Sequence, residues 1–271
     1  MKKILGWVLL LASQLTLAQT SNPMLNKVAD IAMVQSFAPT GILRVGINLG
    51  NPVLAGSSDK SQPQPQGVTI DIAKEIGKRV KLPVELISFQ SAGATVEALK
   101  ANQIDLIFVA IDPVRGADIS YTPAYIQIEG AYMVKTSSPL KNNEEVDIAG
   151  NEIVVGKGSA YDLYLTREIK KATLLRAMNS QSVVDDFMSG KGNVAAGVKQ
   201  QLESDSQRYN GVRMLPGRFM VINQAIGIPK ARPEVDKTTA YLSAVIQELK
   251  ASGFIANSMK RHGIEGAKVA E

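Results

Sequence analysis

Few side chains of this sequence have the type and spacing that catalysis requires. The 271 residues include no cysteine and one histidine, His262, which lies near the end of the chain beside Lys260 and Arg261. Thiol chemistry is therefore excluded, and a serine–histidine system would depend on that one imidazole. No histidines and carboxylates are spaced as metal ligands are, so we expect neither a metal nor a cofactor. An acid–base pair such as Glu129 with Lys199 stays open.

The sequence contains more residues suited to binding an anion than to catalysis. Gly158 and Ser159 precede a helical pattern that starts at Ala160, and free N–H groups at the positive end of a helix favour an anion. Ser159 is equally suited to capping that helix, and the two roles are compatible. Arg115 carries a planar guanidinium, which suits a carboxylate. It could instead lie on the surface or pair with a neighbouring acid such as Asp112.

The overall charge argues against one class of partner. The chain carries a formal charge of +5, and 45% of its residues are hydrophobic, which is ordinary for a globular protein. No dense run of lysine and arginine is interleaved with aromatic residues, so nucleic acid is not an expected partner. The mild positive excess is compatible with a solvated surface and slightly favours anionic solutes.

The N-terminus has the pattern of an export signal. Lys2 and Lys3 are followed by an apolar stretch over 4–17 and by Ala18, which predicts a signal peptide over 1–18. The stretch is shorter than the roughly 20 apolar residues of a membrane span, although an uncleaved anchor is the alternative. Because there is no cysteine, lipid attachment at the cleavage site is excluded. We therefore expect a periplasmic protein that is not a lipoprotein.

The first part of the remaining chain alternates between strand and helix patterns. The apolar run over 104–111 suits a strand that is buried on both faces. Such alternation argues for a parallel sheet and an α/β architecture. The predicted order is strand 43–48, loop 50–66, helix 70–80, strand 84–89, helix 95–101 and strand 104–111.

The alternation starts again later, which predicts two similar lobes. Residues 191–196 echo 102–107, because in each case a helix ends, a turn follows and an acid or amide opens a buried strand. The predicted elements here are strand 153–156, helix 160–169, strand 173–178, helix 182–188, strand 225–228 and helix 235–251. The last helix has an apolar face formed by Leu242, Val245, Ile246 and Leu249.

Two long apolar segments, 125–135 and 218–229, are the predicted connections between the lobes. Two such crossings make a hinge that bends about a cleft without separating the lobes. The predicted organisation is an N-terminal helical extension over 19–40, a first lobe over 41–134 plus 222–271, and a second lobe over 135–221.

The order and spacing of several segments resemble a known family, the type II periplasmic solute-binding proteins of amino-acid-type ABC importers (extracellular solute-binding family 3). The resemblance implies a two-lobe fold in which each lobe has a central, mostly parallel sheet flanked by helices. The segments that carry it are GILRVGIN, GVTIDIAKEIGKRVKLPVELISF, VEALKANQIDLIFVA, ISYTPAYIQIEGAYMV and DIAGNEIVVGKGSAYDLYL, which together cover most of 41–263.

The resemblance also implies a function. The expected protein is a monomer that closes its lobes on a small anionic or zwitterionic solute, an amino acid or a related organic acid, and delivers it to an inner-membrane ABC permease. No chemistry on the solute is needed. Two alternatives remain, which are a dehydratase-like enzyme of the same fold and a ligand-sensing partner of a membrane receptor.

Two ligand-binding elements are implied for the solute carboxylate. The segment Asp112-Pro113-Val114-Arg115 is similar to the family's Thr-x-x-Arg motif, which places Arg115 on the carboxylate. Gly158 and Ser159 occupy the place of the Gly-Thr turn that binds the same carboxylate from the second lobe.

The family's acceptor for the α-amino group has no counterpart here. The place of that aspartate falls at Val198, beside Lys199. Lys199 could bind a second anionic group, as in a dicarboxylate, or lie on a helix face in water. Glu129 or Asp112 could alternatively receive an amino group. The remaining predicted ligand-binding residues are Asn48, Asn51, Ala110, Tyr125 and Tyr161. Tyr125 matches the family's hinge tyrosine, which serves packing as often as ligand contact.

Overall fold

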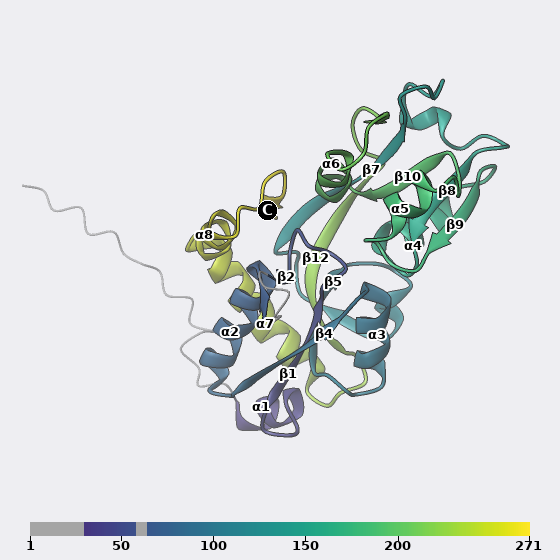
Figure 1. Ribbon diagram of the computed structural model, residues 1–271. Helices are drawn as coiled ribbons and strands as arrows, with labels where there is room; N and C mark the ends of the chain where they lie inside the picture. The colour runs from purple at the N-terminus through teal and green to yellow at the C-terminus, as the bar shows by residue number, and fades with distance from the viewer. Residues whose placement is uncertain (1–29, 58–63) are drawn as a thin grey trace, which may run out of the picture.

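The structure is a computed structural model that describes residues 30–57 and 64–271. The predicted signal peptide, its cleavage site and most of the predicted N-terminal extension lie outside these residues. Within them, no helix has both the length and the apolar character that crossing a membrane requires. The helix α1 (Ile31–Phe37) is the part of the extension that is described, and it packs on α7 (Val235–Ala251) as Figure 1 shows.

The first half of the molecule is built on a parallel set of strands in the order β4–β1–β5. The helices α2 and α3 cover these strands, and α7 and α8 complete this half from the C-terminal part of the chain. The bounds are β1 (Leu43–Asn48), α2 (Val68–Val80), β4 (Val84–Phe89), α3 (Ala92–Lys100), β5 (Leu106–Ala110) and α8 (Phe254–Arg261).

The second half repeats this arrangement with the strand order β10–β8–β9, again parallel. The helices α4, α5 and α6 pack on these strands. The bounds are β8 (Glu152–Gly156), α4 (Ala160–Glu168), β9 (Thr173–Ala177), α5 (Val183–Met188), β10 (Val194–Val198), α6 (Lys199–Ser206) and β11 (Val212–Met214).

The long strands β7 (Ile126–Lys135) and β12 (Met220–Pro229) join the halves into one curved sheet (Figure 1). They pair with each other in antiparallel register, β12 continues onto β5, and β7 continues onto β10. The short strands β6 (Ile119–Tyr121) and β13 (Lys268–Val269) pair with β12 and β7, while β2 (Gly56–Ser57) and β3 (Pro65–Gln66) form a separate ribbon. The predicted crossings are therefore confirmed as extended segments, and the lobe boundaries at 134/135 and 221/222 stay predictions.

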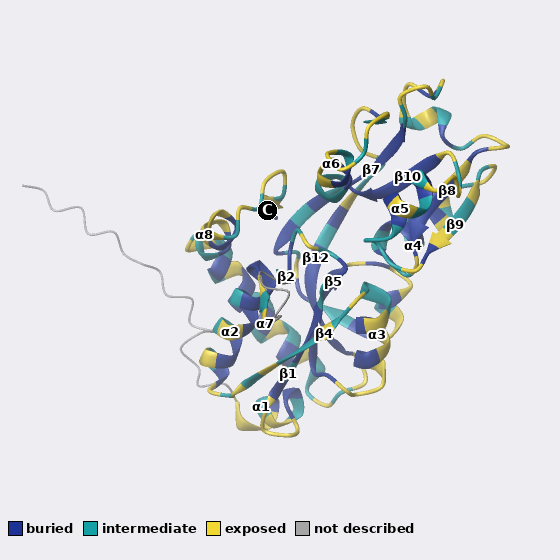
Figure 2. Ribbon diagram, viewed as in Figure 1, coloured by how far each residue is buried: buried dark blue, intermediate teal, exposed yellow. Residues whose placement is uncertain are grey.

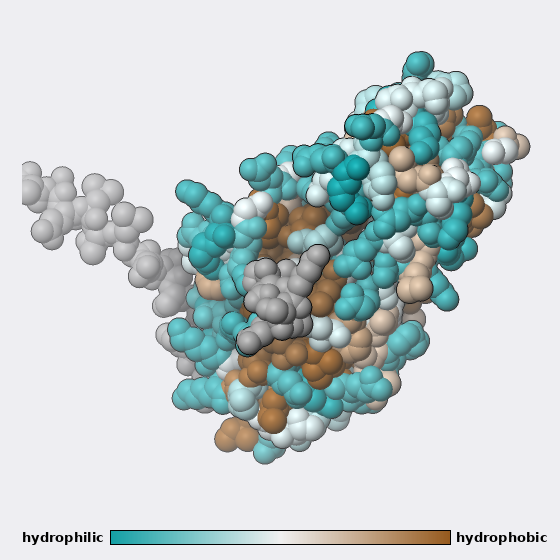
Figure 3. Space-filling model, in the orientation of Figure 1, coloured by the Kyte–Doolittle hydropathy of each residue, from teal (hydrophilic) through white to brown (hydrophobic). Residues whose placement is uncertain are grey.

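The burial of the strands explains why the alternation of strand and helix patterns could be recognised in the sequence. Every residue of β5 and of β10 is buried, as expected of strands covered on both faces. Figure 2 shows buried strands at the centre of each half with exposed residues on loops and outer helix faces. On the face seen in Figure 3, hydrophilic side chains predominate, and apolar ones gather in the hollow between α8 and the second half.

The predicted elements are largely confirmed, with differences at their ends. The bounds of β1, β4 and α7 match the prediction, and the four apolar residues predicted for one face of α7 are buried. The helix α3 begins earlier than predicted because Ser91 caps it, its hydroxyl accepting from the Ala94 amide. The elements that the sequence patterns did not indicate are α6, α8, β2, β3, β6, β11 and β13.

A buried ion cluster fixes the base of the first half. Asp105 is fully buried at the start of β5, and it accepts from the amide, Nε and NH2 of Arg44 at 3.0, 3.0 and 2.7 Å. Arg232 donates to it at 2.7 Å from the turn before α7. Burial alone would raise the pKa of Asp105, but the hydrogen bonds from the two arginines more than reverse this and hold it below its usual value.

Candidate functional site

A small cavity lies where the halves meet, beyond the carboxyl ends of the parallel strands. This is where α/β sheets of this kind bind ligands. Its volume is about 40 Å³. The lining comes from the loop after β1 (Asn48, Gly50, Asn51), from Ala92, from the end of β5 (Val109, Ala110), from Arg115, from the start of α4 (Ser159, Ala160, Tyr161), from Ser180 and Val198, and from β12 (Ile222, Gln224).

Arg115 is the central charged group of this cavity. Its side chain is almost fully buried, with the residue only 6% exposed. One guanidinium nitrogen donates to the carbonyl of Ala110 at 3.2 Å and another to the carbonyl of Gly158 at 2.8 Å. Burial lowers the pKa of Arg115, against the opposing influence of Tyr121 and Asp112. Within the described residues, the guanidinium forms no hydrogen bond to a carboxylate.

The acids nearest to Arg115 are paired with other cations. Asp112 uses one oxygen for the amides of Val114 and Arg115, and the other lies 2.9 Å from Arg167 of α4. Asp162 accepts from the Gly158 amide at 2.8 Å and lies 3.0 Å from Arg176. The positive charge of Arg115 is therefore left without an acid of its own among the described residues.

The N-terminal end of α4 lines the cavity, which is the position in which a helix can bind an anion. The Ser159 hydroxyl accepts from the Asp162 amide at 3.0 Å, so the capping role predicted for it is confirmed. Gly158 has φ +69°, a conformation that favours glycine. Tyr161 donates to the Ser180 hydroxyl at 2.9 Å, and burial raises its pKa so that the phenol stays neutral. The first amides of the helix have no partners within it.

The loop after β1 supplies amide side chains. The Asn48 Oδ1 accepts from the Gly50 amide at 2.9 Å, which holds the loop in shape. The Oδ1 atom of Asn51 is buried and, among the described residues, has no hydrogen-bond partner. Six of the predicted ligand-binding residues thus line the cavity: Asn48, Asn51, Ala110, Arg115, Ser159 and Tyr161. A seventh, Gly158, contributes its carbonyl to Arg115.

The structure places Lys199 and Glu129 outside the cavity lining and pairs them with each other. The Lys199 ammonium lies 3.6 Å from Glu129, whose other oxygen accepts from Arg218 at 2.5 Å. These hydrogen bonds and charges lower the pKa of Glu129, with Arg218 making the largest contribution. Glu129 lies between Ile128 and Gly130 on β7, and Gly130 is paired with the cavity-lining Val198. Since side chains alternate along a strand, Glu129 points to the opposite face.

Tyr125 and Asp112 also lie outside the cavity lining. Tyr125 is fully buried in the apolar core, where its ring meets Phe108 edge-on at 5.7 Å between ring centres. Burial strongly raises its pKa. Asp112 lies next to the cavity but is committed to Arg167. Neither residue supports the ligand contact that we expected.

Some lining residues were not predicted. Gln224 is paired with Ala110 across β5 and β12, so its side chain shares the face that carries the cavity. Alternation within 220–224 could have indicated Ile222 and Gln224 together. Ser180 follows β9 in a turn, and no pattern marked it. Val198 was noted as the place of an absent acid, and it lines the cavity.

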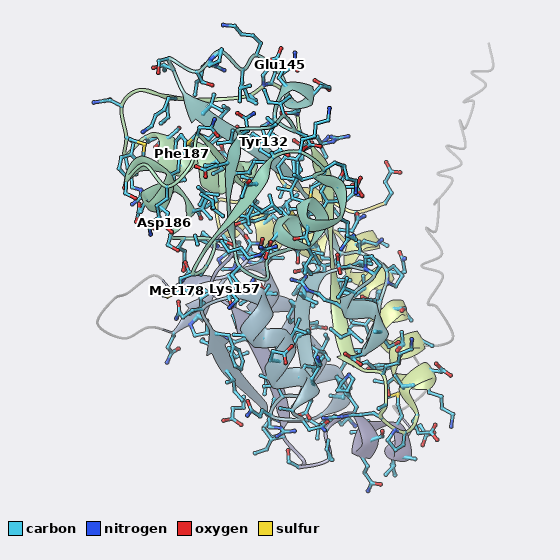
Figure 4. All side chains as sticks on the ribbon, turned by 90° about the vertical axis from the view of Figure 1, so that its right-hand side faces the viewer. Tyr132, Glu145, Lys157, Met178, Asp186 and Phe187 are labelled. Carbon is cyan, nitrogen blue, oxygen red and sulfur yellow. The ribbon has the colours of Figure 1, made fainter. Side chains whose placement is uncertain are left out.

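The halves touch around the cavity. The Gln181 amide donates to the Leu49 carbonyl at 2.9 Å, and Arg167 meets Asp112, each contact joining one half to the other. Near Arg115, the backbones of Gly93 and Gly158 approach so closely that a Cβ on Gly158 would lie 3.3 Å from the Gly93 Cα. This is a closed arrangement. Figure 4 shows Lys157 and Met178, from the loops after β8 and β9, together at this boundary.

Comparison with known proteins agrees with this architecture. Residues 43–264 match the family described as bacterial extracellular solute-binding proteins, family 3. A search of curated proteins gave no match.

Solved structures of low sequence identity share the fold. A mutant of ArgBP from T. maritima has a TM-score of 0.72 at 17% identity, covering 86% of this chain and 100% of its own. A solute receptor for L-cysteine of Neisseria gonorrhoeae has 0.72 at 18%, covering 84% and 92%. An amino acid ABC transporter substrate-binding protein from Streptococcus pneumoniae, bound to L-arginine, has 0.71 at 17%, covering 88% and 99%.

The family and these neighbours are binding proteins rather than enzymes, and their type II periplasmic binding protein fold is the curved α/β sheet described above. The family match spans most of the chain, from β1 to the end of α8. This chain therefore belongs to the bacterial extracellular solute-binding proteins of family 3.

Proposed function

We propose that this protein is the periplasmic substrate-binding component of an ABC importer and that it closes on a small carboxylate-bearing solute. The observation that carries the proposal is Arg115, a buried cation that lines the cavity and has no carboxylate partner among the described residues. A buried charge without a counterion is costly. A solute carboxylate would supply that counterion, aided by the start of α4.

Closure follows from where the contacts lie. The cavity lining comes from both halves, so a solute bound there stabilises the arrangement in which they touch. The proposed lobes are 41–134 plus 222–271 and 135–221, with β7 and β12 as the hinge. A closed monomer carrying its solute would then dock on an inner-membrane ABC permease.

Enzymatic turnover is less well supported by the cavity. Among the described lining residues there is no carboxylate, histidine or lysine. The Tyr161 phenol is held neutral by burial. A general acid–base pair is therefore missing from the lining itself, although one solved neighbour is titled an ancestral amino-acid-binding protein that is a precursor of cyclohexadienyl dehydratase.

A thermal-shift screen of protein freed of ligand by unfolding and refolding tests the proposal. The panel contains amino acids, hydroxy acids, dicarboxylates and neutral sugars. A solute at 100 times its dissociation constant adds about 2.7 kcal/mol of stability. That corresponds to a rise of roughly 5–10 °C for a chain of this size. Shifts with carboxylates support the proposal, and shifts with neutral sugars alone would contradict it.

Closure itself can be tested at Gly93. A leucine there would project into the backbone at Gly158 and hold the halves apart, whereas the fold should tolerate it because leucine favours a helix more than glycine does. We expect Gly93→Leu to give a larger radius of gyration by small-angle X-ray scattering. The control is Ala94→Leu, one residue along α3 at an exposed position. Identical scattering from the two variants would contradict the role of this contact.

A further inference from the structure

The charge of the cavity limits which carboxylates fit it. Among the described lining residues, Arg115 is the one side chain that is ionised at neutral pH. The neighbouring acids offset it only in part, since Asp112 is bound to Arg167 and Asp162 to Arg176. The described lining therefore has a net positive charge, which a ligand with a net charge of −1 balances.

An α-amino acid balances the positive charge of the lining poorly, because its own net charge is zero. Its carboxylate would offset Arg115, but its ammonium would enter a cavity that contains no carboxylate among the described lining residues. A desolvated ammonium without an acidic partner is unfavourable, and the guanidinium nearby repels it. The wall at the end of β10 is apolar, formed by Val198 beside Ile222 of β12.

The neutral polar groups of the lining suit a hydroxyl instead. The Asn51 Oδ1 is buried without a partner among the described residues, and an unpaired buried acceptor is stabilised by a donor. Gln224 offers a second neutral amide from β12 and is 6% exposed. The cavity volume of about 40 Å³ exceeds the roughly 10–15 Å³ that one water molecule needs, so the cavity has room for more than a single water.

Resting on the function proposed above, we infer that the solute is a 2-hydroxy monocarboxylate, with a hydroxyl where an amino acid carries its ammonium. Arg115 and the start of α4 bind the carboxylate, and Asn51 accepts the hydroxyl proton. Glycolate and lactate have this chemistry. A dicarboxylate is disfavoured because Lys199, the cation predicted for a second acidic group, is bound to Glu129.

The test uses pairs of compounds that differ in a hydroxyl against an ammonium group. Isothermal titration of the protein freed of ligand compares L-lactate with L-alanine and glycolate with glycine. We expect the hydroxy acid of each pair to bind about tenfold more tightly or better. If the amino acids bind as well or better, the inference is overturned while the proposed carboxylate-binding function stands. If no carboxylate binds, both are overturned.

An isosteric variant tests the charge argument directly. Gln224→Glu places a carboxylate in the cavity without changing side-chain size, and it should weaken hydroxy-acid binding and strengthen amino-acid binding, each about tenfold. The matched control is Gln127→Glu on β7, where the side chain meets Asn223 on the other face of the sheet and does not line the cavity. Its ligand preference should equal that of the wild type. An unchanged preference in a folded Gln224→Glu protein would overturn the inference. If that variant fails to fold, the paired titrations decide.

Discussion

Arg115→Met should abolish carboxylate binding. Methionine preserves much of the buried side-chain volume but removes the guanidinium, the buried cation that we place on the solute carboxylate. Truncating one partner of a buried, hydrogen-bonded charge pair costs about 2–5 kcal/mol of binding. Since each 1.4 kcal/mol is about tenfold, we expect the dissociation constant to rise by roughly thirtyfold to several thousandfold. Titration with the carboxylate found in the screen measures this.

The fold should survive this substitution, because it removes an uncompensated buried charge. The carbonyls of Ala110 and Gly158 lose their donors, which offsets part of that gain. A matched control is Arg213→Met, since Arg213 also donates to two backbone carbonyls, those of Ser138 and Leu140, in the second half. It should lower stability without changing affinity. Undiminished carboxylate binding by the Arg115→Met variant would contradict the proposed site.

The second large effect is expected on the free energy of unfolding when Asp105 is replaced. Asp105→Ala leaves Arg44 and Arg232 without their shared carboxylate at the base of the first half. Removing one partner of a buried ion pair typically costs about 3–5 kcal/mol. For a chain of this length, that is a fall in melting temperature of roughly 6–20 °C. Calorimetry measures it, and Asp118→Ala, which removes an exposed acid 3.6 Å from Lys100, should shift the melting temperature far less.

The same residue makes the stability depend on pH in a defined direction. The folded state holds the pKa of Asp105 below the unfolded value of about 3.9. Its contribution is therefore fully present above that value and is lost as the pH falls through the lower folded pKa. Asp105→Asn should accordingly show a smaller loss of stability on acidification below about pH 4 than the wild type. Parallel curves for the two proteins would contradict this role.

Much of the fold was predictable because buried elements leave recognisable patterns of apolar residues in the sequence. Strands such as β5, buried throughout, give short apolar runs, and α7, buried on one side, repeats apolar residues at helical spacing. Both kinds of signal are local. The helix α6 was not indicated because it buries little more than Leu202 and Asp205, so it has almost no apolar face to recognise.

Site residues could be predicted only where the local sequence alone sets the position of the residue. Ser159 caps α4 wherever that helix packs, and Arg115 lies in the short turn after β5. The pairing of Lys199 with Glu129 could not be predicted, because the pairing of β7 with β10 that brings them together is not apparent in the sequence. For Tyr125 the sequence left packing and ligand contact open for a similar reason, since β12 and the Phe108 ring reach it from distant parts of the chain.

The return of β12 to the edge of β5 has a consequence for how the chain folds. Gln224 lies beside Ala110 although the entire second half intervenes between them in the sequence. The second half is continuous, so it needs no such distant closure and should form early, whereas the first half must wait for β12 and α7. Until then β5 presents an unpaired, wholly apolar edge, which is a template for aggregation. We therefore expect folding to be limited by the docking of residues 222–271, and chaperone dependence to be concentrated in that interval.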